Sequence, residues 1–182
     1  MIYPNKQYYL IINKWLMLTI LIVAGSLTLF SQDLDYRAQS LYIYKFTKYI
    51  NWPEEKTKGN FIIGVYGNSP IFEELNLMAS LKKAGNEQTI EVKEVIQDED
   101  LSIYHIVYIA ASKSRQIKII IEQIGENPVL IVAEREGMAN KGADISFMVS
   151  DYEILKFEVN IAILEFHKLS ISEELVKLGY KL

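Results

Sequence analysis

Apolar and polar positions separate most cleanly between Arg37 and Asn51. One side of a helical wheel collects the apolar residues Ala38, Tyr42, Ile43, Phe46, Tyr49 and Ile50, and the other collects Arg37, Ser40, Lys45, Thr47 and Lys48. This 3.6-residue period predicts an amphipathic helix. Leu41 and Tyr44 fall among the polar residues, where a plain surface helix does not need them. Pro53 disfavours helical backbone at Trp52, so we expect the helix to end there.

Apolar runs of strand length follow this helix. We expect strands at residues 61–66, 90–95, 106–110 and 129–133. Ser69 before Pro70 predicts the start of a helix after the first strand. Ser112 or Ser114 is expected to cap a second helix that runs to about Ile124.

The pattern changes after Gly142. Residues 145–149 and 155–159 flank Ser150-Asp-Tyr-Glu, which predicts a hairpin, and a helix is expected from Asn160 to Lys168. Ser170 with Glu173 fits a capping box for the last helix, and Ser172 is a competing cap. The predicted fold is α/β: a single-domain open mixed sheet, mostly parallel and Rossmann-like, with an antiparallel C-terminal hairpin edge and flanking helices.

The amino end has the pattern of an export signal. The first 31 residues hold Lys6 and Lys14 and no acid, and residues 15–30 are mostly apolar. This run has signal-peptide length and is short for a membrane span, which needs roughly 20 apolar residues. We therefore expect a signal peptide at 1–31, a single domain at 32–182 and a periplasmic location. An uncleaved membrane anchor and a buried N-terminal helix are the alternatives.

Composition narrows the possible functions. Removing the two signal lysines from the 19 basic residues leaves 17 against 23 acidic residues, a net charge near −6 that disfavours nucleic-acid binding. Without cysteine, thiol catalysis and cysteine-ligated metals are excluded. His105 and His167 are expected to be structural, and HExxH, GxSxG and phosphate-loop motifs do not occur. We therefore expect a protein that is not an enzyme and that has no cofactor and no metal site.

Two loops are candidates for binding a small molecule. Residues 67–70 and 111–114 each join the carboxyl end of a predicted strand to a helix, where ligands gather in open α/β sheets. The candidate crevice residues are Asn68, Ser69, Ser112 and Ser114. Helix amides there can hold an anion, helped by Lys113 and Arg115, and ordinary helix capping is the alternative. Glu134, Arg135 and Glu136 follow the next strand and are expected to pair with one another or face water.

The first helix is the stronger candidate for a contact surface. Leu41 and Tyr44 beside Arg37, Lys45 and Lys48 predict an aromatic and basic face for a protein partner, continued by the turn at Trp52. The alternative is that Leu41 and Tyr44 pack under the N-terminal arm or the Trp52 loop.

Several features recur in a fixed order. They are an aromatic helix with Phe46 that ends in Trp52-Pro53, a strand with Gly64 near its middle, a helix that begins at Pro70, Gly142 before a strand, the Phe157-x-x-Asn160 segment, and a Leu-x-Ile-Ser segment before the last helix. In this order and spacing the chain from about Tyr36 to Leu178 resembles the YfiR-like family of periplasmic regulators.

The resemblance implies a non-enzymatic repressor. Such a protein restrains an inner-membrane diguanylate cyclase, or a sensor kinase, through its extracytoplasmic region, and an outer-membrane lipoprotein can sequester it. It also implies a homodimer, whereas the family's disulfides cannot form in this cysteine-free chain. Most matched residues are expected to be architectural: Phe46 and Trp52 pack, Gly64 and Gly142 permit tight backbone, and Asn160 caps. The alternative function is a periplasmic small-molecule-binding sensor domain.

Overall fold

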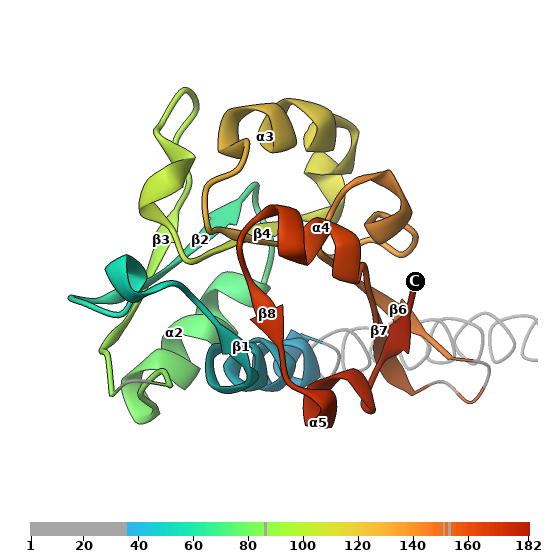
Figure 1. The fold of residues 1–182 in the computed structure, drawn as a ribbon, viewed down its shortest axis with the longest axis horizontal. Helices are drawn as coiled ribbons and strands as arrows, with labels where there is room; N and C mark the ends of the chain where they lie inside the picture. Colours follow the sequence, from blue (N-terminus) through green and yellow to red (C-terminus); the bar gives the residue numbers. More distant parts are fainter. Residues whose placement is uncertain (1–35, 86, 151, 153) are drawn as a thin grey trace, which may run out of the picture. The chain divides into compact units, whose positions relative to one another are not determined.

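The computed structural model describes residues 36–85, 87–150, 152 and 154–182 (Figure 1). The expected signal peptide, residues 1–31, lies outside this range. None of the helices within it is long and apolar enough to span a membrane.

A seven-stranded sheet organises the described chain, in the order β3-β2-β4-β5-β6-β7-β9. The strands are β2 (Phe61–Tyr66), β3 (Ile90–Glu94), β4 (Ile106–Ile109), β5 (Leu130–Ala133), β6 (Ile145–Val149), β7 (Leu155–Val159) and β9 (Tyr180–Lys181). Neighbours from β3 to β6 are parallel, and β6 and β7 form the antiparallel hairpin. The predicted fold class is confirmed. The sequence prediction missed β9, which adds parallel to β7 and forms the edge beside the hairpin.

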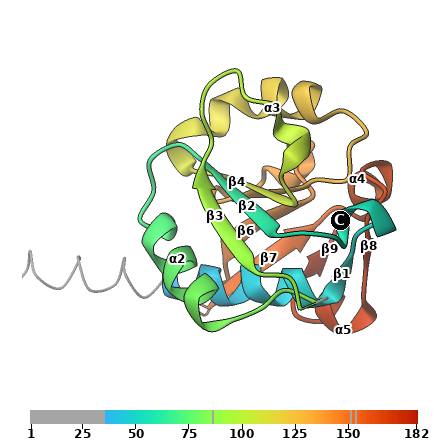
Figure 2. The ribbon, with the colours of Figure 1, turned by 90° about the vertical axis from the view of Figure 1, so that its left-hand side faces the viewer.

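Helices cover both faces of the sheet (Figure 2). The helical residues 36–49 lie with α2 (Ile71–Leu81) and α5 (Glu173–Val176) on one face. The 3-10 helix η3 (Ala111–Gln116) and α3 (Ile117–Ile124) lie on the other. Successive side chains of β4 alternate between two buried clusters: Ile106 and Tyr108 in one, Val107 and Ile109 in the other. This alternation gives each face of the sheet its own core.

The first helix is held by its apolar stripe. Ile43 and Phe46 are fully buried, and the Phe46 ring lies 6.2 Å from Phe147 and 5.3 Å, edge-on, from Phe157. The helix ends at position 49, before the predicted end, because β1 (Ile50–Asn51) is extended and pairs with β8 (Ser170–Ile171). This small second sheet was not predicted.

The predicted helix caps are partly right. Asn160 caps α4 (Ile161–Phe166) by accepting from the amide of Ile163, and Ser172 caps α5. The capping box at Ser170 is wrong because Ser170 lies in β8. The predictions for Ser112 and Ser114 are also wrong: α3 begins after η3 without a side-chain cap, and the Ser114 hydroxyl donates to Ala111.

Helix α2 begins one residue later than a Ser69 cap predicts. Its N-cap is Pro70, although the Ser69 hydroxyl accepts from the amide of Ile71 at 3.4 Å. The Ser69 hydroxyl therefore still acts as a side-chain acceptor at the start of this helix, just before the proline.

Gly64 and Gly142 both require the absence of a side chain. A Cβ on Gly64 would lie 2.7 Å from the Tyr104 ring and from Val95, and Gly142 has φ +105° with a Cβ position 2.6 Å from Ile121. The expectation that both glycines permit tight backbone is confirmed.

Candidate functional site

The exposed stripe of the first helix carries the predicted contact residues. Arg37, Leu41 and Lys45 are exposed, and Leu41 shows 55% of its surface to solvent. The other face of this helix already supplies the core, so Leu41 is not needed for its packing. It supplies the apolar element that a contact surface needs.

Tyr44 lies half-buried between two lysines. The ammonium groups of Lys48 and Lys82 lie 5.8 Å and 5.7 Å from the centre of its ring. Cations at this distance are attracted to the ring face. Tyr44 therefore packs against basic side chains, and Lys82 is a part of this surface that sequence reasoning missed.

The carboxyl end of the first helix is tied to the connection that follows α2. Lys48 donates to the carbonyl of Ala84 at 3.1 Å, and the amide of Gly85 donates to the carbonyl of Thr47 at 3.1 Å. Lys48 thus has a structural contact in addition to its place beside Tyr44. The two helices lie side by side in both ribbon views.

Helix α2 carries two further exposed apolar side chains. Leu77 and Leu81 are 58% and 71% exposed. We use "aromatic-basic face" for the surface formed by Arg37, Leu41, Tyr44, Lys45, Lys48 and Lys82. The two helices are 20 or more residues apart in the chain, so the sequence of the first helix alone does not reveal the contribution of Lys82.

Trp52 packs as expected of an architectural residue. Its ring lies 5.0 Å, edge-on, from Phe61 and 6.3 Å from His105. It is half-buried and shares a small pocket of about 130 Å³ with Lys48 and Phe61. Trp52 therefore borders the aromatic-basic face through Lys48, and its main contacts are internal.

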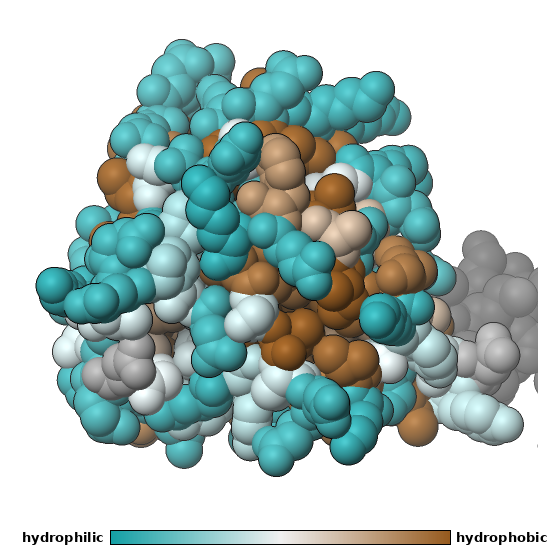
Figure 3. Space-filling model, viewed as in Figure 1, coloured by the Kyte–Doolittle hydropathy of each residue, from teal (hydrophilic) through white to brown (hydrophobic). Residues whose placement is uncertain are grey.

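Apolar surface also gathers over α4 and β8, in the middle of the face seen in Figure 3. Phe166 at the end of α4 is 49% exposed. This patch was not predicted.

A carboxylate of the chain itself bridges the two loops of the predicted crevice. Glu134, directly after β5, accepts from the amide of Ala111 at 2.9 Å, the hydroxyl of Ser69 at 3.5 Å and the hydroxyl of Tyr36 at 2.8 Å. The prediction that Glu134 pairs with Arg135 or faces water was wrong. Its position after the fourth parallel strand, at the same sheet edge as the two loops, was the signal that was overlooked.

The four crevice residues do not form one site. Asn68 and Ser69 line a pocket of about 350 Å³ together with Glu73 and Glu94. Ser112 and Ser114 do not line it, and Ser114 is buried and bonded to Ala111. Two carboxylates in the lining disfavour the anion that the helix amides were expected to hold.

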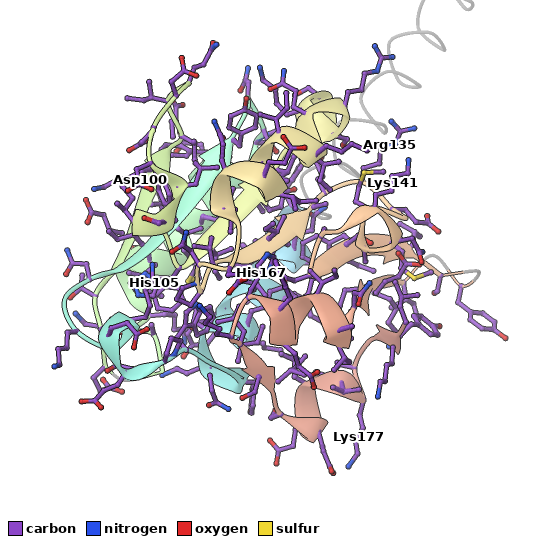
Figure 4. All side chains as sticks on the ribbon, turned by 45° about the horizontal axis from the view of Figure 1, so that its top comes forward. Asp100, His105, Arg135, Lys141, His167 and Lys177 are labelled. Atoms are coloured by element: carbon purple, nitrogen blue, oxygen red, sulfur yellow. The ribbon has the colours of Figure 1, made fainter. Side chains whose placement is uncertain are left out.

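Both histidines have structural partners (Figure 4). His105 accepts from the amide of Ile62 at 3.0 Å through Nδ1, and its Nε2 donates to the carbonyl of Lys56 at 2.8 Å. His167 Nδ1 lies 2.9 Å from Asp144, and both side chains are fully buried. The predicted structural roles are confirmed. In the part of the chain that the structure describes, no three His, Asp or Glu side chains are grouped as metal ligands.

A family model described as YfiR/HmsC-like matches residues 36–180. The chain belongs to the YfiR/HmsC-like family. This family is regulatory and periplasmic. The features on which the resemblance rests, from Phe46 to Asn160, all lie within the match. A comparison with curated proteins found no match.

One solved structure similar to this YfiR/HmsC-like chain is described as an ABC domain in complex with L-Trp from Streptococcus pneumonia. The two share 11% sequence identity with a TM-score of 0.44, over 66% of this chain and 54% of that one. The chain thus spans about half the length of that protein.

Burial of His105 gives this YfiR/HmsC-like protein a pH-dependent stability. Burial lowers the pKa of His105 to about 4, below the value of about 6.5 in an unfolded chain. Between these values the unfolded chain binds a proton that the folded protein rejects, so stability is lost as the pH falls. At pH 4.5 we expect the loss from this group to be roughly 2–3 kcal/mol.

The replacement His105→Gln isolates this contribution, because glutamine keeps one acceptor and one donor but does not titrate. Urea unfolding at pH 7 and pH 4.5 measures it. We expect the wild type to lose roughly 2–3 kcal/mol more than the variant between the two conditions. Equal losses of stability in the wild type and the variant would contradict the assignment of this pH dependence to His105.

Proposed function

We propose that this YfiR/HmsC-like protein is an exported, non-enzymatic regulator that binds and restrains an inner-membrane signalling protein through its extracytoplasmic region. The partner is a diguanylate cyclase or a sensor kinase. In this proposal residues 1–31 direct export and 32–182 act in the periplasm, with an uncleaved anchor as the alternative form. An outer-membrane lipoprotein that withdraws the regulator, and a homodimer, complete the proposal.

The aromatic-basic face carries this proposal. Exposed Leu41 and half-buried Tyr44 supply apolar contact area, and lysines surround them. Aromatic and apolar anchors inside a charged rim are typical of protein interfaces. Four basic side chains on an otherwise acidic protein favour a partner with an acidic surface.

Restraint then follows from a shift of populations. A regulator that binds the inactive conformation of its partner more tightly than the active one lowers the active fraction by that difference in affinity. Withdrawal of the regulator reverses the shift. No chemical step is needed, in keeping with the regulatory character of the family.

A matched pair of variants tests the face. Leu41→Asp with Lys45→Glu changes two exposed side chains on the first helix, and Ile119→Asp with Lys118→Glu makes the same chemical change on α3, where both side chains are also exposed. Lys48 is avoided because it holds Ala84. The readout is crosslinking and capture of the tagged protein from its own cell envelope, followed by mass spectrometry.

We expect the wild type and the α3 variant to capture an inner-membrane cyclase or kinase, and the first-helix variant to lose at least tenfold of that capture, as expected when a central contact worth ~2 kcal/mol is removed. Equal capture by both double variants would contradict the assignment of the face.

A small-molecule sensor is the second candidate, because Asn68 and Ser69 line a pocket at the carboxyl edge of the sheet. Thermal stabilisation by a periplasmic metabolite would support it. Loss of that stabilisation in Asn68→Ala would place the ligand in this pocket.

A further inference from the structure

The small pocket beside the end of the first helix has a positively charged lining. Its volume is about 130 Å³, and the residues that line it include Lys48, Trp52 and Lys56. None of the residues described there is an aspartate or a glutamate. Because two ammonium groups line the pocket without a carboxylate, it favours an anion over a cation.

The indole N–H of Trp52 is a donor that needs an acceptor. Its Nε1 is buried and has no hydrogen-bond partner among the described residues. A buried donor without an acceptor is costly, so nearly all such groups in native proteins bind a partner. Because Trp52 lines the pocket, a ligand oxygen bound against the edge of its ring would supply this acceptor.

Lys48 is the better placed of the two lysines to bind an anion. An ammonium group has three N–H donors. Lys48 Nζ donates to one main-chain carbonyl, at 3.1 Å, whereas Lys56 Nζ donates to two, at 2.5 and 2.8 Å. The charge of Lys56 also interacts with Asp100 and Glu55, which lie outside the lining. Lys48 therefore keeps two further donors and the less compensated charge.

The rest of the lining limits the size of the ligand and gives it an apolar contact. Ile50 and Phe61 line the pocket, and both are buried. An apolar cavity of roughly 150 Å³ takes benzene, which has six carbon atoms. A pocket of about 130 Å³ therefore has room for a ligand of about six non-hydrogen atoms. A carboxylate on a short aliphatic chain combines this size with a negative charge and an apolar part.

We propose that this pocket binds a short-chain monocarboxylate. Its carboxylate accepts from Lys48 and from the indole N–H of Trp52, and its chain lies against Ile50 and Phe61. The binding itself does not depend on the proposed function. If that function holds, the ligand also reaches the aromatic-basic face, because the Lys48 ammonium group lies 5.8 Å from the centre of the Tyr44 ring and a bound carboxylate competes with the ring for it.

Butyrate, which has six non-hydrogen atoms, is the probe, and the indole N–H signal of Trp52 is the readout. The chain has two tryptophans, Trp15 and Trp52, so a ¹H–¹⁵N spectrum of the chain as the cell produces it shows few indole signals, and Trp52→Phe identifies the one at the pocket. We expect butyrate to move this signal downfield and to saturate with a Kd on the order of 1 mM, which is reasonable for so small a ligand. A signal that butyrate does not move, compared with sodium chloride at the same ionic strength, would overturn the proposal.

Three further small molecules separate the charge of the ligand from its shape. Butylamine carries the same chain with a positive charge, butanol carries it without a charge, and formate carries the negative charge without the chain. We expect each to bind at least about tenfold more weakly than butyrate. Equal binding of butanol or butylamine would contradict the carboxylate, and equal binding of formate would contradict the apolar contact.

Three variants test the residues. Lys48→Gln removes the charge but keeps a donor for the carbonyl of Ala84, and we expect about tenfold weaker binding of butyrate. Trp52→Phe keeps an aromatic ring beside Phe61 but lacks the N–H, and we expect a severalfold loss, followed through the amide signal of Gly85 in the same lining.

Lys45→Gln is the matched control for Lys48→Gln, because Lys45 is exposed on the same helix and does not line the pocket. We expect it to bind butyrate as the wild type does. Equal affinities of the Lys45 and Lys48 variants would overturn the assignment of the site. These titrations use the protein without its membrane partner, so their failure and a failure of the envelope capture are distinguishable.

Discussion

Replacing Asp144 by alanine is expected to lower the free energy of unfolding by about 2–6 kcal/mol, because it leaves two buried donors without an acceptor, each at a cost of about 1–3 kcal/mol. Asp144 and His167 are both fully buried. One carboxylate oxygen lies 2.9 Å from His167 Nδ1, and the other accepts from the amide of Ile131 at 2.7 Å. Removal of the carboxylate would leave a buried amide and a buried ring nitrogen without acceptors.

The surroundings of the His167 ring increase this expected loss of stability further. Its Nε2 is buried without a partner among the described residues, so Asp144 is the hydrogen-bond partner that the structure gives this ring. Burial raises the pKa of Asp144 despite the opposing effect of His167. Burial therefore disfavours the ionised carboxylate, and the hydrogen bonds with His167 and the Ile131 amide oppose this effect.

Urea unfolding at pH 7 measures this prediction, with Asp144→Asn as the control. Asparagine keeps an acceptor for Ile131 and for His167, so its loss should be clearly smaller. A change below ~1 kcal/mol for Asp144→Ala would contradict the structural role of the pair.

Replacing Phe46 by alanine is expected to cost a similar amount, ~3–5 kcal/mol, through a cavity in the core. Phe46 is fully buried, and its ring contacts Tyr42, Phe147 and Phe157. These contacts join the first helix to the β6–β7 hairpin. The cavity would therefore loosen the attachment of the helix that carries the aromatic-basic face.

Leu41→Ala is the matched control for Phe46→Ala, since it truncates an exposed side chain on the same helix. We expect its stability to stay within ~0.5 kcal/mol of the wild type, while capture of the membrane partner falls. Unfolding midpoints and envelope capture, measured on both variants, separate the two roles. Equal loss of stability in both would contradict the division of this helix into a packed and a free face.

The strands and the first helix were predictable because their patterns are local. Residues 61–66 and 145–149 are each a short, mostly buried run, which is typical of a strand. In the first helix, the 3.6-residue period places Phe46 inside and Leu41 outside. The two-residue strands β1, β8 and β9 carry no period of their own. They exist only because distant segments meet, as Ile50 meets Ile171.

The candidate site was predictable only where its residues lie on one helix. The exposure of Leu41 and the lysines follows from the helix period, whereas Lys82 comes to Tyr44 from another helix. Glu134 joins Tyr36, Ser69 and Ala111, which lie 98, 65 and 23 residues away in the chain. No local pattern encodes such a meeting, so sequence reasoning did not predict that Glu134 bridges the two loops.

Restraint of a membrane signalling protein by the aromatic-basic face is the central claim, and its most direct test is the output of that protein in cells. Cells that lack the regulator receive the wild type, the Leu41→Asp/Lys45→Glu variant or the Ile119→Asp/Lys118→Glu variant at equal levels, and the cyclase or kinase output is measured. The account predicts low output with the wild type and the α3 variant, and output as high as in the deletion strain with the first-helix variant. Full restraint by the first-helix variant would contradict it.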